Sequence, residues 1–307
     1  MQFLNPKTDF AFKKIFGSDR SKPILISFLN ALLYDEQPVI ADLEIIDPYL
    51  APKIEGMKDT FVDVRARLHD GRNVIIEMQV LNVEGFEKRV LYNAAKAYAT
   101  QLVSGEAYRD LSPVVALTIT DFVMFPETPA YESAYVLKER QAGREYPQGD
   151  LQLVFVELPK FQKGLDELAG VKEKWLYFLR NAPDLQVIPA AMGEVTEIQA
   201  AFQIANLAGL SREELEIYER KMMFIHDQRG AITRAVRVAR EETRQEALAE
   251  GETRGRTAMA RDIARQMLGQ FDDQRIAELT GLPPDAVAAL RTENAPVPAD
   301  LPDRDHA

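Results

Sequence analysis

The chain has 307 residues, 46% of them hydrophobic, and its 37 basic and 48 acidic side chains give a formal net charge of −11. It contains no cysteine and three histidines, His69, His226 and His306. Disulfide-stapled scaffolds, thiolate nucleophiles, zinc fingers and iron–sulfur clusters are therefore excluded, and any bound metal must be held mainly by oxygen atoms.

The N-terminal residues lack the basic, apolar and small-residue order of a signal peptide, and no run of about 18 apolar residues is present to cross a bilayer. We therefore expect a cytoplasmic protein with no membrane partner. The acidic excess argues against a surface that coats nucleic acid broadly. Most of this excess follows residue 120, however, so a polyanion is least disfavoured on the first 120 residues.

The hydrophobic pattern alternates between helical and strand periodicity along the first half of the chain. It predicts helices at 8–17, 21–34 and 84–103, a hairpin with arms at 60–68 and 72–81, and strands at 113–119, 133–137 and 151–157. From about residue 164 the pattern predicts helices alone, including a long charged one from about 211 to 250. Strands interleaved with helices indicate an α/β or α+β fold.

The hairpin has one apolar row per arm, and both rows must face the same core. The first row is Val62, Val64, Ala66 and Leu68, and the second is Val74, Ile76, Met78 and Val80. A three-residue loop that ends on a left-handed Gly71 aligns the rows and pairs Val64 with Ile76, whereas a two-residue turn places them on opposite faces. The same register places Asp63 directly opposite Glu77.

Two carboxylates facing each other across a strand pair destabilise the sheet unless a positive charge lies between them. A divalent cation with oxygen ligands, Mg²⁺ or Mn²⁺, would supply this charge. The alternative, which the pattern alone favours, is that Arg65 and Arg67 neutralise Asp63 and Glu77 on an exposed face of the hairpin.

Several segments then point to a known family. Asp63 on one strand is followed by Glu77-Met78-Gln79 on the next. Around this pair lie Thr8 to Gly17 (TDFAFKKIFG), Ile76 to Val80, Lys88 to Tyr98 (KRVLYNAAKAY) and Gln101 to Tyr108. In this order, over residues 1–160, they resemble the Rpn family of recombination-promoting nucleases and transposase-like proteins in the PD-(D/E)XK nuclease superfamily.

The resemblance implies a restriction-endonuclease-like α/β fold, with a mixed β-sheet core flanked by helices, and the hydrophobic pattern predicts that an all-α region follows it. It also implies metal-dependent hydrolysis of DNA. Asp63 and Glu77 would be metal ligands together with the Met78 carbonyl. Asp9 would hold the metal through a water molecule or accept a hydrogen bond from that water. Gln79 takes the position of the superfamily's lysine. An amide orients water but carries no positive charge.

A nearby lysine, Lys13, Lys14 or Lys96, is a candidate source of the missing charge. Lys13 and Lys14 are also candidate phosphate contacts, although an ordinary solvated helix face is an equal alternative. The spacing of Arg89, Tyr92 and Lys96 predicts that they share one side of a helix, where they would bind DNA. Packing of Tyr92 in the core is an alternative for that residue.

The sequence predicts four regions: a nuclease-like domain at 1–160, a helical region with a long charged helix at 161–255, a helix-turn-helix-like element at 256–292 and a disordered tail at 293–307. The second helix of that element is mostly alanine, so it favours packing or partner binding over sequence-specific reading of DNA. Trp175 is predicted to anchor the core of the helical region.

The leading hypothesis is a Mg²⁺- or Mn²⁺-dependent DNA endonuclease with little sequence preference. By resemblance it is linked to recombination, mobile DNA or defence. The C-terminal helices would then mediate homo-oligomerisation or target choice. The alternative is a catalytically weak or inactive protein of nuclease fold that acts through its helical C-terminal region. A transcription-factor-like reader is disfavoured.

Overall fold

The computed structural model describes residues 2–50, 58, 60–146 and 149–293. The chain divides into two compact units, Met1–Arg229 and Gly230–Ala307. The tail predicted at 293–307 lies, apart from Glu293, outside the described residues.

The first unit is built on a six-stranded mixed sheet. Its strands, in spatial order, are β1 (Leu43–Ile46), β4 (Val64–Leu68), β5 (Asn73–Gln79), β6 (Val114–Thr120), β8 (Leu151–Glu157) and β7 (Glu132–Val136). The pairs β5–β6 and β6–β8 are parallel, and the other neighbours are antiparallel. A separate two-stranded ribbon pairs β2 (Tyr49–Leu50) with β3 (Thr60–Phe61). The α/β fold predicted from the sequence is confirmed.

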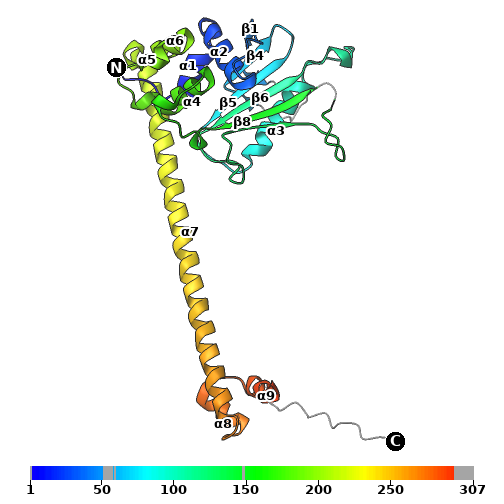
Figure 1. Ribbon diagram of the computed structural model, residues 1–307, viewed down its shortest axis with the longest axis vertical. Helices are drawn as coiled ribbons and strands as arrows, with labels where there is room; N and C mark the ends of the chain where they lie inside the picture. The colour runs from blue at the N-terminus through cyan, green and yellow to red at the C-terminus, as the bar shows by residue number, and fades with distance from the viewer. Residues whose placement is uncertain (1, 51–57, 59, 147–148, 294–307) are drawn as a thin grey trace, which may run out of the picture. The chain divides into compact units, whose positions relative to one another are not determined.

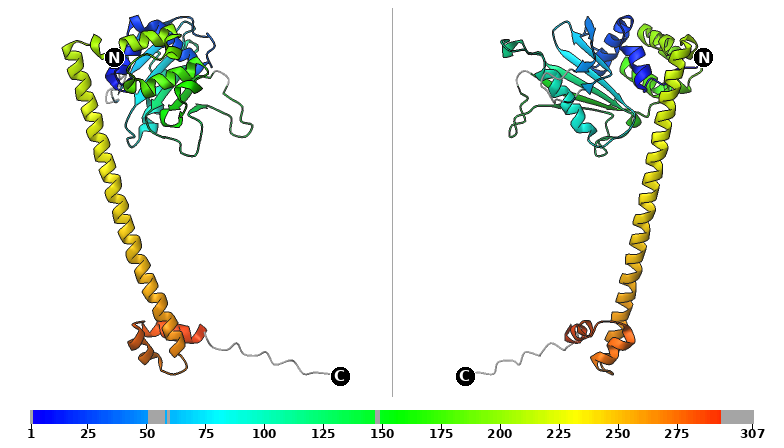
Figure 2. Two further views of the ribbon diagram at one scale, coloured as in Figure 1. Left: turned by 60° about the vertical axis from the view of Figure 1, so that its left-hand side comes forward. Right: turned by 180° about the vertical axis from the view of Figure 1, so that it is seen from behind.

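Helices cover both faces of this sheet (Figures 1 and 2). They are α1 (Asp9–Phe16), α2 (Lys22–Leu33), α3 (Phe86–Ala99), α4 (Val171–Asn181), α5 (Ala190–Gly193), α6 (Thr196–Ile204) and the start of α7 (Arg212–Met267). Short 3-10 helices lie at Asp19–Ser21, Tyr108–Asp110, Leu158–Lys160, Leu165–Glu167, Ala182–Asp184 and Leu207–Gly209. Helix α3 covers one face, and α1, α2, α4 and α6 contribute to the larger apolar core on the other.

The strand sequences explain this two-sided burial. Every residue of β6 is buried, as expected for a central strand covered on both faces. On β5, Val74 and Ile76 face the larger core, whereas Ile75 packs against α3. Helix α1 begins where the Thr8 side chain accepts a hydrogen bond from the Ala11 N–H at 3.2 Å.

The hairpin adopts the predicted loop and register. The Leu68 N–H donates to the Arg72 carbonyl at 2.8 Å, and Val64 lies opposite Ile76. Gly71 has a φ of +90°, in the left-handed region that glycine tolerates best. The loop prediction is therefore confirmed, and it fixes the register of the two arms from Val64 to Arg67.

We expect Gly71→Ala to lower the free energy of unfolding by about 1–2 kcal/mol, because a side chain is strained at this φ. The new Cβ would also lie 3.3 Å from the Ser112 Oγ. Urea denaturation measures the loss. Gly209→Ala is the matched control, since no other atom lies within 4 Å of its Cβ position. Equal effects of the two substitutions would contradict this explanation of the turn.

The second unit contains the remainder of α7, with α8 (Asp273–Thr280) and α9 (Pro284–Glu293). Ala264 and Leu268 pack with Ile276, Val287 and Leu290. The two short helices lie where the helix-turn-helix-like pair was predicted. The long helix was predicted to end near residue 250, but it continues to Met267. Gly251 and Gly255 are tolerated inside it because a single glycine costs a helix only about 1 kcal/mol.

Candidate active site

Asp63 lies at a bend, directly before β4. Val64 packs in the larger core and Val62 packs on the α3 side, so the strand alternation breaks between them. The prediction of one continuous apolar row from Val62 to Leu68 is therefore wrong at its first residue. The break arises because the Val62 N–H donates to the Pro48 carbonyl at 3.2 Å, next to the β2–β3 ribbon.

The bend changes the expected relation between Asp63 and Glu77. The β4–β5 ladder ends at Val64, and the Asp63 carboxylate accepts a hydrogen bond from the Met78 N–H at 2.7 Å. The Asp63 side chain is thus hydrogen-bonded to the backbone of Met78, the residue after Glu77. The direct cross-strand pairing of the two acids, predicted by extending the register, is not part of the ladder.

Asp9 on α1 forms an acid pair with Asp63. Burial is the main cause that raises the pKa of Asp63 to about 7; the hydrogen bond with Asp9 acts in the same direction, whereas the Met78 N–H and Lys13 oppose the rise. Burial also acts to raise the pKa of Asp9, but hydrogen bonds with Lys13 and Asp63 outweigh it, so the net shift is downward. As the pH falls, Asp63 is therefore the member of the pair that is protonated first.

Lys13 supplies the positive charge next to this pair. Its Nζ lies 2.6 Å from Asp9 Oδ1 and 3.7 Å from Asp63 Oδ1. From α7, Lys221 Nζ approaches the other oxygen of Asp9 at 3.7 Å. Arg67 instead pairs with Glu44 on β1 at 3.5 Å. The cation beside Asp63 thus comes from α1 and not from the hairpin arginines.

Glu77 and Gln79 share a different cation, on the α3 side of the sheet. Arg89 Nη2 lies 2.5 Å from Glu77 Oε1 and 2.8 Å from Gln79 Oε1. Burial raises the pKa of Glu77, and Arg89 and Asn93 oppose this rise. The guanidinium lies over the Phe86 ring, 4.9 Å from its centroid, which helps to hold it in place.

The other predicted DNA contacts, Tyr92, Lys14 and Lys96, differ in their accessibility and in their partners. Tyr92 is 39% exposed and therefore accessible, while Lys14 forms an ion pair with Glu214 on α7. Lys96 is only 4% exposed, and its ammonium donates to the Lys58 carbonyl at 2.6 Å and to Thr60 Oγ1 at 3.3 Å. This burial argues against the predicted contact of Lys96 with DNA and against its supplying charge to the site.

A family sequence model described as PD-(D/E)XK nuclease family transposase matches residues 6–235. The chain belongs to this PD-(D/E)XK family. The match includes Asp9, Asp63 and Glu77, and also helices α4 to α6 and the start of α7. No curated protein and no solved structure gives a significant match to the chain.

Membership of the PD-(D/E)XK family supports a nuclease connected with mobile DNA, and it makes DNA the implied substrate. Within the described ranges, no helix is both long enough and apolar enough to cross a membrane. PD-(D/E)XK nucleases typically use divalent metals, so the side chains at the site can be tested for their fit to such an ion.

The side chains fit a divalent cation by their chemistry. The Asp9 and Asp63 carboxyl groups lie within hydrogen-bonding distance, and Asp63 is only 13% exposed, so a cation bound between them would offset the charge of both carboxylates. Among the residues that the structure describes, no group of three or more histidine or carboxylate side chains is already gathered to hold a metal. The ligand set Asp63, Glu77 and Met78 therefore stays a prediction.

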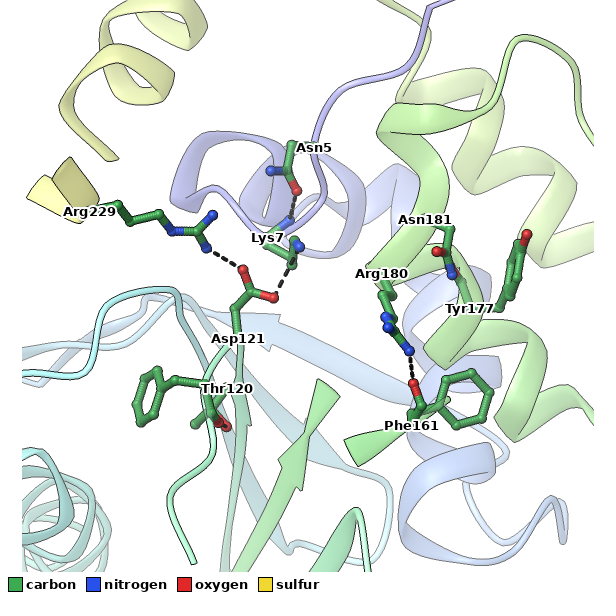
Figure 3. A network of polar contacts seen from close by, with 10 residues as sticks. Asn5, Lys7, Thr120, Asp121, Phe161, Tyr177, Arg180, Asn181 and Arg229 are labelled. Carbon is green, nitrogen blue, oxygen red and sulfur yellow. Dashed lines mark hydrogen bonds and ion pairs between the residues drawn. The ribbon is translucent and has the colours of Figure 1, made fainter. Parts of the chain in front are cut away.

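Asp121, which no sequence motif indicates, connects three segments at the edge of the site (Figure 3). It follows β6 directly, and its backbone N–H donates to the Gln79 carbonyl at 2.9 Å. Its carboxylate lies 3.0 Å from Lys7 Nζ and 2.5 Å from Arg229 Nη2 on α7. Asp121 thus connects Arg229 of α7 to the end of β6, next to Gln79.

Proposed function

We propose that this PD-(D/E)XK family member is a DNA endonuclease that depends on Mg²⁺ or Mn²⁺ and cleaves with little sequence preference. The observation that carries the proposal is the largely buried Asp63 carboxyl group, which hydrogen-bonds with Asp9 and lies beside the Lys13 ammonium group. The family resemblance suggests a role in recombination, mobile DNA or defence against invading DNA, and we further propose that the protein acts in the cytoplasm.

The side chains have distinct proposed roles. Asp63 and Glu77, with the Met78 carbonyl, would hold the cation. Asp9 would bind the cation through a water molecule or accept a hydrogen bond from that water. A bound divalent ion would lower the pKa of water at the site and offset charge on the phosphate. The Gln79 amide would orient water, although Gln79 Nε2 donates to the Leu81 carbonyl at 2.7 Å in this structure.

Positive charge for the phosphate would come from two helices. Lys13 on α1 lies beside Asp9 and Asp63, and Arg89 on α3 contacts both Glu77 and Gln79. These cations compensate for the lack of a lysine at position 79. Lys14 and Tyr92 are additional proposed DNA contacts.

We expect Mn²⁺ to raise the melting temperature of the protein, because the ion binds the folded state. Glu77→Ala should abolish the increase, and the exposed Glu127→Ala should retain it. The affinity for Mn²⁺ should fall by about tenfold per pH unit below pH 7, because the ion must displace the proton of Asp63, whose pKa is about 7. The increase in melting temperature should shrink accordingly. A melting temperature that does not respond to Mn²⁺ at any pH would contradict metal binding.

The sign of this pH dependence follows from linkage. The pKa of Asp63 rises on folding from its ordinary value of 3.8 to about 7, so the metal-free folded state gains stability below about pH 4 and loses it as the pH rises through 7. Metal binding has the opposite preference, because it requires the deprotonated carboxylate. Stabilisation by Mn²⁺ should therefore be largest above pH 7.

The second candidate function is a nuclease-fold interaction protein that acts through its C-terminal helices. The observation in its favour is the set of apolar side chains exposed along α7: Ile232, Val236, Val238 and Leu248. Such residues suit association with another helix, including one from a second copy of the chain. A melting temperature that does not change with Mn²⁺, together with self-association in analytical ultracentrifugation, would favour this function over the enzyme.

A further inference from the structure

Two aromatic rings stack on the surface of the β2–β3 ribbon. Tyr49 lies opposite Phe61 in the antiparallel ladder, and their ring centroids are 4.7 Å apart with an interplanar angle of 24°. Phe61 is nevertheless 64% exposed. Strand pairing therefore holds a flat aromatic face toward solvent, where it is already ordered for a ligand that can stack on it.

The position of this pair relates it to the acidic site. Phe61 precedes Asp63 by two residues, so their Cα atoms are at most about 7 Å apart. The residue between them, Val62, is buried on the α3 side and fixes the backbone at this point. The exposed ring and the candidate metal ligand are thus carried by one short, anchored segment.

A cation with unused hydrogen-bonding capacity lies two residues beyond Asp63. The Arg65 Nε is buried and has no hydrogen-bond partner, and Arg65 forms no ion pair within the described part of the chain. Burial lowers the pKa of Arg65, and the negative charge of Asp47 opposes this shift. Asp47 Oδ1 also accepts a hydrogen bond from the Tyr49 N–H at 2.9 Å, which relates Arg65 to the aromatic pair. An acceptor from a ligand would satisfy this guanidinium.

We propose that the Tyr49–Phe61 pair is a stacking site for an unpaired nucleobase of the DNA bound at Asp63, with Arg65 contacting the adjoining phosphate. A base inside a duplex already stacks on both of its neighbours, so only a single-stranded or extruded base can cover the Phe61 ring. The substrate class is therefore DNA with unpaired bases next to the cleaved bond. This inference rests on the proposed nuclease function.

Equilibrium binding of the full-length protein in a metal chelator tests the stacking site without cleavage. The probes are a labelled single-stranded oligonucleotide and its duplex, each measured by fluorescence anisotropy. Phe61→Ala should weaken binding of the single strand about tenfold and leave duplex binding within about twofold. Phe61→Trp should restore single-strand binding, and Tyr108→Ala, which removes another exposed ring, should change neither.

A second readout reports the stacking itself. The fluorescence of 2-aminopurine in the single strand should be quenched by the wild-type protein and by Phe61→Trp, but not by Phe61→Leu, which keeps an apolar contact on Tyr49 without an aromatic face. Arg65→Ala should reduce the slope of log affinity against log salt for the single strand by about 0.7. Circular dichroism checks that each variant is folded, and Phe61→Leu replaces Phe61→Ala if the latter is not.

The outcomes separate this inference from the proposed function. Equal weakening of single-strand and duplex binding in Phe61→Ala and Phe61→Leu, or no weakening of either, would overturn the stacking site, even if the protein cleaves DNA with metal. Binding of the single strand through Phe61 by a protein that never cleaves DNA would support the stacking site and overturn only the nuclease proposal.

Discussion

Asp63→Asn should lower the rate of DNA cleavage by at least about 10²- to 10³-fold. The amide cannot carry the negative charge that a divalent ion requires, and it keeps nearly the same size, so the Met78 N–H still has an acceptor. Nicking of supercoiled plasmid with Mg²⁺ or Mn²⁺ measures the rate.

Asp110→Asn is the matched control for this substitution, since the Asp110 side chain is exposed and pairs only loosely with Arg109 at 3.8 Å. It should cleave at the wild-type rate. If Asp63→Asn also cleaved at that rate while remaining folded, Asp63 would not belong to the site.

Trp175→Ala should lower the free energy of unfolding by about 3–5 kcal/mol, the usual cost of removing a buried tryptophan. Trp175 is fully buried on α4, and its ring lies 5.8 Å from the Phe16 ring and 5.5 Å from the Phe28 ring. Its indole N–H donates to Ser27 Oγ at 3.2 Å. The substitution therefore opens the contact between α4 and the helices α1 and α2.

This effect is measured by urea denaturation followed by circular dichroism, because Trp175 is the only tryptophan in the sequence and its fluorescence is lost. Val187→Ala provides the comparison, as its side chain is 69% exposed and should change stability by less than about 0.5 kcal/mol. A loss below 1 kcal/mol for Trp175→Ala would show that this packing is not what joins the helices.

The parts of the fold that depend on local sequence could be predicted. The hairpin loop follows from the need for both apolar rows to face one core, and Gly71 permits the backbone that this requires. The central strands β6 and β8 follow from continuous apolar runs. The short edge strand β1 was missed because four residues give too little periodicity to distinguish a strand from a loop.

The parts that depend on distant contacts could not be predicted. The bend at Asp63 arises from a hydrogen bond between Val62 and Pro48, which the alternation within one strand does not reveal. Likewise, Arg229 lies 108 positions from Asp121 in the sequence but pairs with it in the fold. Short motifs therefore locate the acids Asp63 and Glu77, whereas tertiary packing decides which cations accompany them.

The position of Lys13 shows the same limit. Three lysines were candidates for the charge missing at Gln79, and helical periodicity alone does not rank them. Burial removes Lys96, and Lys14 turns toward Glu214 on α7. Lys13 lies beside both Asp9 and Asp63, while Phe12 and Ile15 of the same helix are buried in the core.

The most direct test of a metal-dependent nuclease is cleavage of supercoiled plasmid by the purified wild-type protein. We expect nicked circles to form with Mg²⁺ or Mn²⁺ above pH 7, and none to form when a chelator removes the ion. Failure to nick DNA with either ion across this pH range, or equal nicking in the chelator, would contradict the account.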